Sequence, residues 1–321
     1  MNASRDAQRQ STPTVMMIRP VRFQSNPQTA DSNSFQNLAQ APAPPVAQQG
    51  ASDEFDALVT ALEAADVQVI AFDGVAEPHS PDQVFPNNWV SFHSDGTVVL
   101  YPMLAENRRT ERRMDVIAAL DQHHGFEIDE IIDLSRFERK GRFLEATGSI
   151  CMDRVNRIAY ACLSPRTDPD LLDRFARRLG YDPMPFRATG RSGWPIYHTN
   201  VMMCIGERFA LICADAIDDA GERRRVLDSL ESTGHRLVTI DHAQMAEFAG
   251  NMLEIESRAG EKILAMSTRA EAALDAKQRG ELESQARIVS ASIDTIENSA
   301  GGSVRCMLAE VHLPRRKARA S

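Results

Sequence analysis

Apolar residues alternate or run continuously in four similar stretches of the chain, and turn-forming residues interrupt each stretch once. The stretches span residues 89–101, 149–163, 201–213 and 252–266. Their turns are, in the same order, Ser94-Asp95-Gly96, Asp153-Arg154, Gly206-Glu207 and Ala259-Gly260. Two apolar runs around a tight turn are typical of a pair of strands. A fifth, partial copy begins at Cys306, so the pattern predicts five similar units.

Helical periodicity and single strands complete these units. The spacing predicts helices over residues 55–65, with Asp53 as the cap, and over 108–123, 169–179, 222–232 and 268–283. It predicts single strands over residues 15–18, 67–72, 127–132, 236–240 and 305–311. Units of this order cannot bury an apolar face alone and should pack side by side. We therefore expect an α/β fold in which five units close a ring without exposed sheet edges.

The two ends and one internal stretch depart from this pattern. Residues 1–13 are polar, so we expect a flexible N-terminal tail, and residues 315–321 form a basic C-terminal tail. Between them, residues 14–314 contain no visible linker and are read as a single domain. Residues 23–50, rich in Asn, Gln, Ser, Ala and Pro, are too long for a simple connection. Long ordered loops are often lids, so we expect this stretch to cover a site.

The composition and net charge of the chain restrict the classes of partner that it can bind. The chain has 321 residues, of which 43% are hydrophobic, and a formal net charge of −9. This charge argues against nucleic acid and anionic membranes as partners and favours a small-molecule substrate. No apolar run is long enough to span a bilayer and no secretory signal is evident, so we expect a cytoplasmic protein. The five cysteines form no CxxC pair, which is typical of reduced thiols.

Residues capable of chemistry stand just ahead of the strand pairs. In a closed ring, equivalent positions of the units meet at the axis. Those positions hold a thiol, an imidazole, carboxylates and amides, namely Asp82, Asn87, Asn88, Glu145, His198, Asn251 and Cys306.

Each of these residues also has an ordinary structural interpretation. Cys306 follows Gly301-Gly302, where the backbone can approach a ligand, and Arg305 beside it would favour a thiolate; the alternative is a buried core cysteine. His198 precedes an apolar strand and is a candidate acid or base, or a hydrogen-bonded residue at a strand end. Glu145 and Asp82 are candidate inward-facing carboxylates or turn residues. The scattered histidines do not support a metal site.

Five short runs of sequence carry a resemblance to a known family. They are MIRP at residues 17–20, PDQVFPNNW at 81–89, LEATGS at 144–149, YHTN at 197–200 and GGSVRCM at 301–307. Over residues 15–314 the chain resembles the guanidine-modifying superfamily of arginine deiminases, amidinotransferases and dimethylarginine hydrolases, and most closely its bacterial citrulline-utilisation hydrolases. The resemblance implies a five-bladed α/β propeller, called a pentein.

The resemblance also implies roles for the candidate residues. Cys306 would attack the central carbon of a guanidino or ureido group and form a covalent thio-intermediate. His198 would protonate the departing nitrogen and then activate water. Glu145 and Asp82 would orient the planar group, and residues 26–36 would close over the amino-acid end. Further substrate contacts are expected from Asn87, Asn88, Asn200 and Arg305. No metal or organic cofactor is required.

Two departures from the family pattern concern the substrate. Asn200 stands where arginine deiminases commonly have aspartate, and Asn87-Asn88 stand where they have a charged pair. A pocket with fewer carboxylates compensates the charge of a buried cation less well. These asparagines therefore favour a substrate with a neutral ureido group over one with a guanidinium. The sequence thus predicts a hydrolase that converts citrulline to ornithine, ammonia and carbon dioxide.

Several alternatives stay open. One is an arginine deiminase or dimethylarginine hydrolase; others are amidine transfer and a non-catalytic pentein that acts by binding. Anchors for the amino-acid end, such as Arg19, Arg191 or Arg258, are suggested by charge alone. The oligomeric state, with a homodimer as one expectation, is not fixed by the sequence.

Overall fold

The computed structural model of the chain describes residues 8–37, 39–191 and 193–316. In these residues the strands form five three-stranded sheets with one topology. The middle strand of each sheet pairs antiparallel with one neighbour and parallel with the other. The sheets are β15 (Ala309–Glu310), β1 (Thr14–Arg19) and β2 (Gln68–Asp73); β3 (Val90–Phe92), β4 (Thr97–Leu100) and β5 (Glu130–Asp133); β6 (Cys151–Asp153), β7 (Ile158–Cys162) and β8 (Asp182–Phe186); β9 (Met203–Ile205), β10 (Phe209–Ile212) and β11 (Arg236–Thr239); and β12 (Leu253–Glu256), β13 (Lys262–Ser267) and β14 (Arg287–Ala291).

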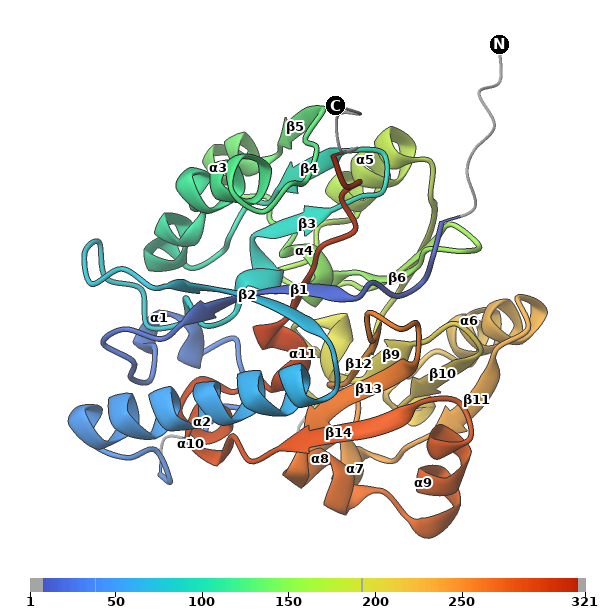
Figure 1. Ribbon diagram of the computed structural model, residues 1–321. Coiled ribbons are helices and arrows are strands. Elements are labelled where there is room, and N and C mark those ends of the chain that lie inside the picture. Colours follow the sequence, from blue (N-terminus) through green and yellow to red (C-terminus); the bar gives the residue numbers. More distant parts are fainter. Residues whose placement is uncertain (1–7, 38, 192, 317–321) are drawn as a thin grey trace.

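Helices connect the strands and cover the sheets (Figure 1). Helix α2 packs on β14 and α10, and α6 packs on β8. The helices are α1 (Pro27–Ala30), α2 (Pro44–Ala64), α3 (Met114–Gln122), α4 (Ala146–Ser149), α5 (Pro169–Leu179), α6 (Ala220–Ser232), α7 (His242–Ala246), α8 (Thr268–Ala273), α9 (Ala276–Glu283), α10 (Asp294–Ala300) and α11 (Val304–Met307).

Helix α5 shows how the sequence specifies such an element. Asp168 caps its start by accepting a hydrogen bond from the backbone N–H of Leu171 (3.0 Å), and Pro169 suits the first helical turn. Gly180 ends the helix in the left-handed conformation, at φ 72°. The apolar residues recur at helical spacing and are buried against the second and third sheets. The predicted bounds 169–179 are confirmed.

The first sheet joins the two ends of the described chain. Strand β15 pairs with β1, with Val15 opposite Glu310 and Met16 opposite Ala309. The mixed α/β class is confirmed, while the closed five-bladed ring and the single domain over residues 14–314 stay predictions.

Three predicted helices differ from the observed ones. Helix α2 begins at Pro44 rather than at residue 55, and Asp53 lies within it instead of capping it. Its first turns bury Ala47 and Ala51, which are too small to give a clear apolar period. The predicted helix 108–123 is a 3₁₀ helix (Glu106–Glu111) followed by α3, and the predicted helix 268–283 is divided into α8 and α9 by a capping box at Asp275.

Two predictions at the chain ends are also wrong in part. Residues 8–13 are not a flexible tail, because Gln10 is buried and donates hydrogen bonds to the backbone oxygens of Met152 (2.9 Å) and Ile205 (3.0 Å). Residues 1–7 and 317–321 lie outside the described residues. The predicted strand 305–311 is instead the one-turn helix α11 followed by β15.

No helix in the described part of the chain combines the length and the apolar character that crossing a membrane requires.

Candidate active site

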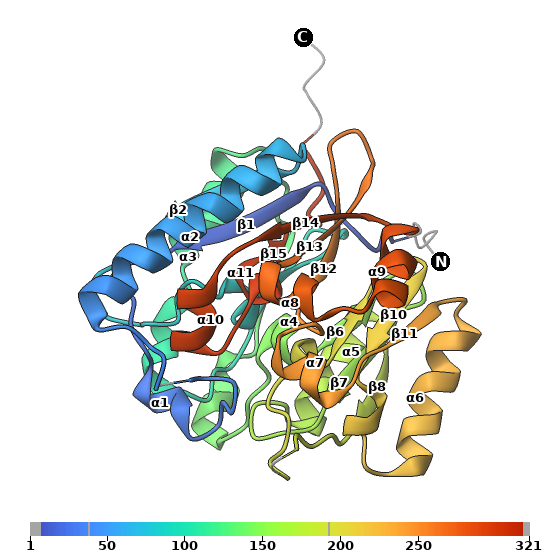
Figure 2. The same ribbon diagram turned by 90° about the horizontal axis from the view of Figure 1, so that it is seen from below.

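Short helical turns that directly precede or contact the sheets contain or directly follow most of the candidate residues. They are the 3₁₀ helix η1 (Pro86–Asn88), α4, the 3₁₀ helix η4 (Thr199–Val201) and α11. Helix α4 packs against both η1 and η4, and α11 packs against η1. Both views place α4 and α11 near the middle of the molecule (Figures 1 and 2). Segments far apart in the sequence thereby deliver their polar side chains to one place.

A small pocket opens between these turns and residues from the predicted lid. It contains four of the sequence-predicted site residues: Asp82, Asn88, His198 and Cys306. Its remaining lining comes from Thr29, Asn33, Phe85, Arg108, Arg166, Tyr197, Ala300, Gly301 and Gly302.

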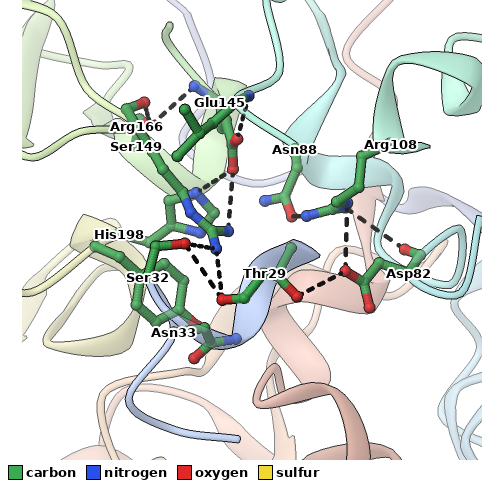
Figure 3. A network of polar contacts seen from close by, with 12 residues as sticks. Thr29, Ser32, Asn33, Asp82, Asn88, Arg108, Glu145, Ser149, Arg166 and His198 are labelled. Carbon is green, nitrogen blue, oxygen red and sulfur yellow. Dashed lines mark hydrogen bonds and ion pairs between the residues drawn. The ribbon is translucent and has the colours of Figure 1, made fainter. Parts of the chain in front are cut away.

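Glu145 lies behind His198 and holds its ring (Figure 3). Nε2 of His198 is 2.8 Å from Oε2 of Glu145, and both side chains are buried. Burial lowers the pKa of His198 to about 4, against the opposing effect of Glu145. Burial disfavours the charged form of Glu145, but the positive charge of Arg166 and the hydrogen bond from His198 outweigh it and hold the pKa of Glu145 below its usual range. An ionised Glu145 accepts the Nε2 proton, so Nδ1 of a neutral His198 keeps a free lone pair.

Gly148 in α4 makes this arrangement possible. A Cβ atom at this position would lie 2.5 Å from Nδ2 of Asn88 and 2.8 Å from Nδ1 of His198. Two polar side chains therefore approach the helix backbone more closely than any other residue would allow.

The thiol of Cys306 receives hydrogen bonds from two amides. Nδ2 of Asn251 is 3.3 Å from the sulfur and Nδ2 of Asn200 is 3.4 Å away. Cys306 is buried in α11, and its backbone N–H donates to the carbonyl of Ser303 (2.9 Å). Amide donors directed at a sulfur suit a thiolate, which is a better acceptor than a thiol. Asn251, which the sequence pattern places at the axis in the fourth unit, thus belongs to the site.

Asp82 and Asn88 share an unexpected partner, Arg108 (Figure 3). Nη1 of Arg108 donates to Oδ1 of Asn88 (3.0 Å), and Nε lies 3.7 Å from Oδ2 of Asp82. Oδ1 of Asp82 and Nδ2 of Asn88 are buried and have no hydrogen-bond partner in the part of the chain that the structure describes. Buried polar atoms are rarely left unpaired, so these atoms are available to a ligand.

Asn87 and Asn200 lie beside the pocket rather than in its lining. Both amide atoms of Asn87 and Oδ1 of Asn200 are buried, and they have no partner within residues 8–37, 39–191 and 193–316. The backbone oxygen of Asn87 accepts a hydrogen bond from Thr147 (3.1 Å), which ties η1 to α4.

Arg305 does not belong to this site, so its predicted substrate contact and its effect on the thiol are wrong. Its side chain is paired with Glu310 (2.7 Å) and donates to the carbonyl of Leu308 (3.0 Å). It lines a different recess together with Cys151 and Cys204. In a helical turn, neighbouring residues point about 100° apart, so Arg305 and Cys306 face different surroundings.

Sequence reasoning missed Arg108 and Arg166, which line the pocket and are buried. Arg108 pairs with Glu111 through two hydrogen bonds of 2.9 Å, and Nη1 of Arg166 lies 3.4 Å from Oε2 of Glu145. Arg108 lies in a predicted helix and Arg166 follows a predicted strand pair. Arginine at such positions is usually a surface residue. None of the suggested anchors Arg19, Arg191 and Arg258 lines the pocket. Arg19 forms an ion pair with Asp56, and Arg258 forms one with Asp66.

The predicted lid does lie over the pocket. Nδ2 of Asn26 donates to Asp82 (2.8 Å), and Nδ2 of Asn33 donates to the carbonyl of Ala300 (3.0 Å). Ser32 accepts a hydrogen bond from Arg166 (2.6 Å), so residues 26–33 contact the pocket from several sides (Figure 3). Among the described residues, no three His, Cys, Asp or Glu side chains converge as a metal site would require.

Solved structures share this fold. The apo structure of ArgZ, an arginine dihydrolase from the ornithine-ammonia cycle in cyanobacteria, matches with a TM-score of 0.72 and 18% identity over 94% of this chain and 41% of that chain. Its N-terminal domain bound to substrate matches with a TM-score of 0.70 and 16% identity, covering 93% and 97% of the two chains. A dimethylarginine dimethylaminohydrolase adduct with S-methyl-L-thiocitrulline has a TM-score of 0.63 and 14% identity, covering 94% and 99%.

This chain spans 41% of the length of full-length ArgZ, and these low identities establish a shared fold alone. No curated protein matches the chain. The family model described as N,N dimethylarginine dimethylhydrolase, eukaryotic, matches residues 19–313. Because this match spans nearly all of the sequence, the chain belongs to the dimethylarginine hydrolase family, a group of hydrolases acting on C–N bonds of arginine-related compounds within the guanidino-modifying superfamily.

Proposed function

We propose that this protein is a cysteine hydrolase that cleaves the ureido C–N bonds of citrulline, giving ornithine, ammonia and carbon dioxide. One observation carries the proposal: a single small pocket contains the thiol of Cys306 and the imidazole of His198, and the latter is hydrogen-bonded to Glu145 at 2.8 Å. Nucleophile, base and orienting carboxylate are the parts that covalent hydrolysis requires.

In the first half of the reaction, the sulfur of Cys306 bonds to the ureido carbon and the thiol proton passes to the free Nδ1 of His198. Glu145 stabilises the imidazolium that forms. The tetrahedral carbon then expels one nitrogen, to which His198 returns the proton, and an S-carbamoyl enzyme remains.

In the second half, His198 takes a proton from water while the water oxygen bonds to the same carbon. The C–S bond breaks, the sulfur regains its proton, and the released carbamate loses carbon dioxide. One citrulline and one water thus give one ornithine, one ammonia and one carbon dioxide. The hydrogen bonds from Asn200 and Asn251 stabilise the sulfur when it is anionic.

The charge balance of the pocket supports a neutral ureido group over a guanidinium. Glu145 is already compensated by Arg166 at 3.4 Å, and Asp82 has Arg108 at 3.7 Å. A bound guanidinium would add a cation where little negative charge is free, and a poorly compensated buried charge costs several kcal/mol. The free Oδ1 of Asp82 can accept a hydrogen bond from a ureido N–H.

Arg166 is the residue we assign to the carboxylate end of the substrate. Its Nε is buried and has no hydrogen-bond partner among the described residues, although the side chain lines the pocket. Its Nη2 contacts Ser32 and the carbonyl of Thr29, so a carboxylate bound there would also contact the lid. Arginine is the side chain best suited to hold a carboxylate in two places.

The proposal also concerns how the five sheets are arranged around the pocket. The five sheets of identical topology would be the blades of a pentein propeller, and the turns that carry Asn88, Glu145, His198, Asn251 and Cys306 would surround its axis.

A second candidate is hydrolysis of a guanidino group. It is favoured by the name of the matching family, which refers to dimethylarginine, and by ArgZ, an arginine dihydrolase. Cys306, His198 and Glu145 would keep their roles, and the first departing nitrogen would come from the guanidino group.

A substrate panel distinguishes the two. Purified protein is incubated with citrulline, arginine and dimethylarginine, and ornithine, citrulline and ammonia are quantified. We expect citrulline to react fastest, with ornithine and ammonia in equal amounts. Faster release of citrulline from arginine or dimethylarginine would favour the second candidate. No turnover of any of the three by the folded protein would favour a binding function.

The nucleophile is tested on the same preparation. Cys306→Ser should abolish turnover, whereas Cys213→Ser, at a buried thiol 3.5 Å from His242, should retain it. A chloroacetamidine reagent should modify Cys306 in preference to the other four thiols, as detected by mass spectrometry. Equal labelling of all five cysteines would argue against an activated site.

A further inference from the structure

A groove lies between strand β5 and helix α5, away from the candidate active site. In three of the other sheets the outer strand contacts the helix of the following unit: α6 packs on β8, α9 on β11 and α2 on β14. At β5 a cavity of about 500 Å³ remains between strand and helix. Its floor is apolar and contains Val99, Ile132, Leu134, Phe175 and Leu179.

The walls of this groove are strongly basic. Arg136, Arg174, Arg177 and Arg178 line it, and a neighbouring recess shares Arg136 and Arg174 and adds Arg139 and Lys140. Against these six cations stand two acidic residues, Glu130 and Asp133. All six cationic residues are exposed. A positive surface of this kind contrasts with the net charge of −9 of the chain.

Most of these cations have no protein partner. Arg178 pairs with Glu130, but in the described chain the other five form no ion pair or side-chain hydrogen bond. Many other arginines, such as Arg112 with Glu138, are paired. Neighbouring like charges repel, by roughly 1 kcal/mol for a pair 4 Å apart in water. An anion bound among them would remove this repulsion.

Three of the cations converge on one aromatic ring. The charged groups of Arg174, Arg136 and Lys140 lie 5.2, 5.3 and 5.5 Å from the ring centre of Phe137. This convergence suits a compact, multiply charged anion better than an extended acidic chain. Phosphate oxygens are the acceptors that arginine holds best through paired hydrogen bonds.

We propose that the groove binds a phosphorylated small molecule of nucleotide size. Its phosphates would lie among Arg136, Lys140 and Arg174, and its organic part would cover the apolar floor between β5 and α5. A groove of this volume is large enough for a small molecule, and it combines an apolar floor with charged walls. Glu130 and Asp133 on the strand side would accept hydrogen bonds from hydroxyl or amino groups of the ligand. This site does not depend on the proposed reaction.

Calorimetric titration of the full chain with ATP, pyrophosphate and adenosine tests the proposal. We expect saturable binding of ATP, weaker binding of pyrophosphate and still weaker binding of adenosine, because both parts of the ligand contribute. The double variant Arg136→Ala/Arg174→Ala should bind ATP at least about tenfold more weakly. Arg224→Ala, which removes an exposed arginine from α6, is the matched control and should leave the affinity unchanged.

Both variants are at exposed positions, and their melting temperatures verify the fold. Three results would overturn the proposal: no saturable ATP binding at millimolar concentration, equal affinity for ATP and pyrophosphate, or full ATP affinity in the double variant.

Discussion

At the scale of single residues, the site depends on the close approach of two side chains to the backbone of α4. His198 is held by Glu145 on one side and lies against the backbone of α4 on the other, at Gly148. Asn88 approaches the same glycine. Because Gly148 has no side chain, both His198 and Asn88 can lie against the backbone of α4.

Gly148→Ala should disable the protein while leaving it folded. The added methyl would displace Asn88 and His198, and a misplacement of about 1 Å at a reacting group can cost on the order of a hundredfold in rate. We expect kcat/KM to fall by about that factor for the best substrate of the panel. Gly280→Ala in α9 is the control, because a Cβ there meets no atom within 4 Å. Unchanged kinetics in Gly148→Ala would contradict the proposed role of His198.

At the scale of elements, the loop between α10 and α11 leads into the helix that contains Cys306, and this loop is tied to a buried acid. The hydroxyl of Ser303 donates to Oε1 of Glu297 (2.6 Å), and Arg269 lies 3.4 Å from Oε2. Tyr197 donates to the carbonyl of Gly301 in the same loop (2.7 Å). The nucleophile is thus placed by contacts that its own helix, one turn long, could not supply.

Glu297→Gln should alter the pH dependence of stability. Burial raises the pKa of Glu297 from 4.5 to about 7, against the hydrogen bond from Ser303 and the charge of Arg269. Between these values the folded protein binds more protons than the unfolded one, so Glu297 makes stability fall as pH rises from about 4.5 to about 7. Glutamine keeps an acceptor for Ser303 and does not ionise.

Urea unfolding checks this expectation. The variant should gain about 3 kcal/mol of unfolding free energy relative to the wild type at pH 8 and little at pH 4.5. Glu231→Gln, at an exposed position of α6, should show neither effect. A loss of stability at pH 8 would mean that the ion pair with Arg269 outweighs the burial of the charge.

At the scale of the whole molecule, residues 8–13 connect sheets that are distant in sequence. Gln10 donates to Met152 in β6 and Ile205 in β9, and its Oε1 accepts a hydrogen bond from the backbone of Arg154 (2.8 Å). The segment leads directly into β1, so residues 8–13 join three sheets, two of them through the side chain of Gln10.

Gln10→Ala should therefore destabilise the protein by about 2 kcal/mol, since it leaves buried backbone groups unpaired. The melting temperature is the measurement. Gln49→Ala, at an exposed position of α2, removes one hydrogen bond to Asp53 and should change it little. Equal melting temperatures for the two variants would show that the segment adds no stability.

Much of the local structure could be predicted from the sequence. Strand pairs and the helix 169–179 follow from apolar spacing and turn residues, which act over a few positions. Helix α2 and the 268–283 segment were harder, because small alanines hide the period and a capping aspartate divides an otherwise helical run. Asp82, Asn88, His198 and Cys306 were found because they occupy matching places in the repeat.

The sequence alone determined the repeated units, the α/β class and the order of the candidate residues, because periodicity and turn chemistry are local properties of a chain. The tertiary structure decided which side chains share the pocket. Arg166 and Arg108 line the pocket, although they were not predicted, and Arg305 lines a different recess. Burial, charge pairing and the direction of a side chain depend on contacts between segments that are far apart in sequence.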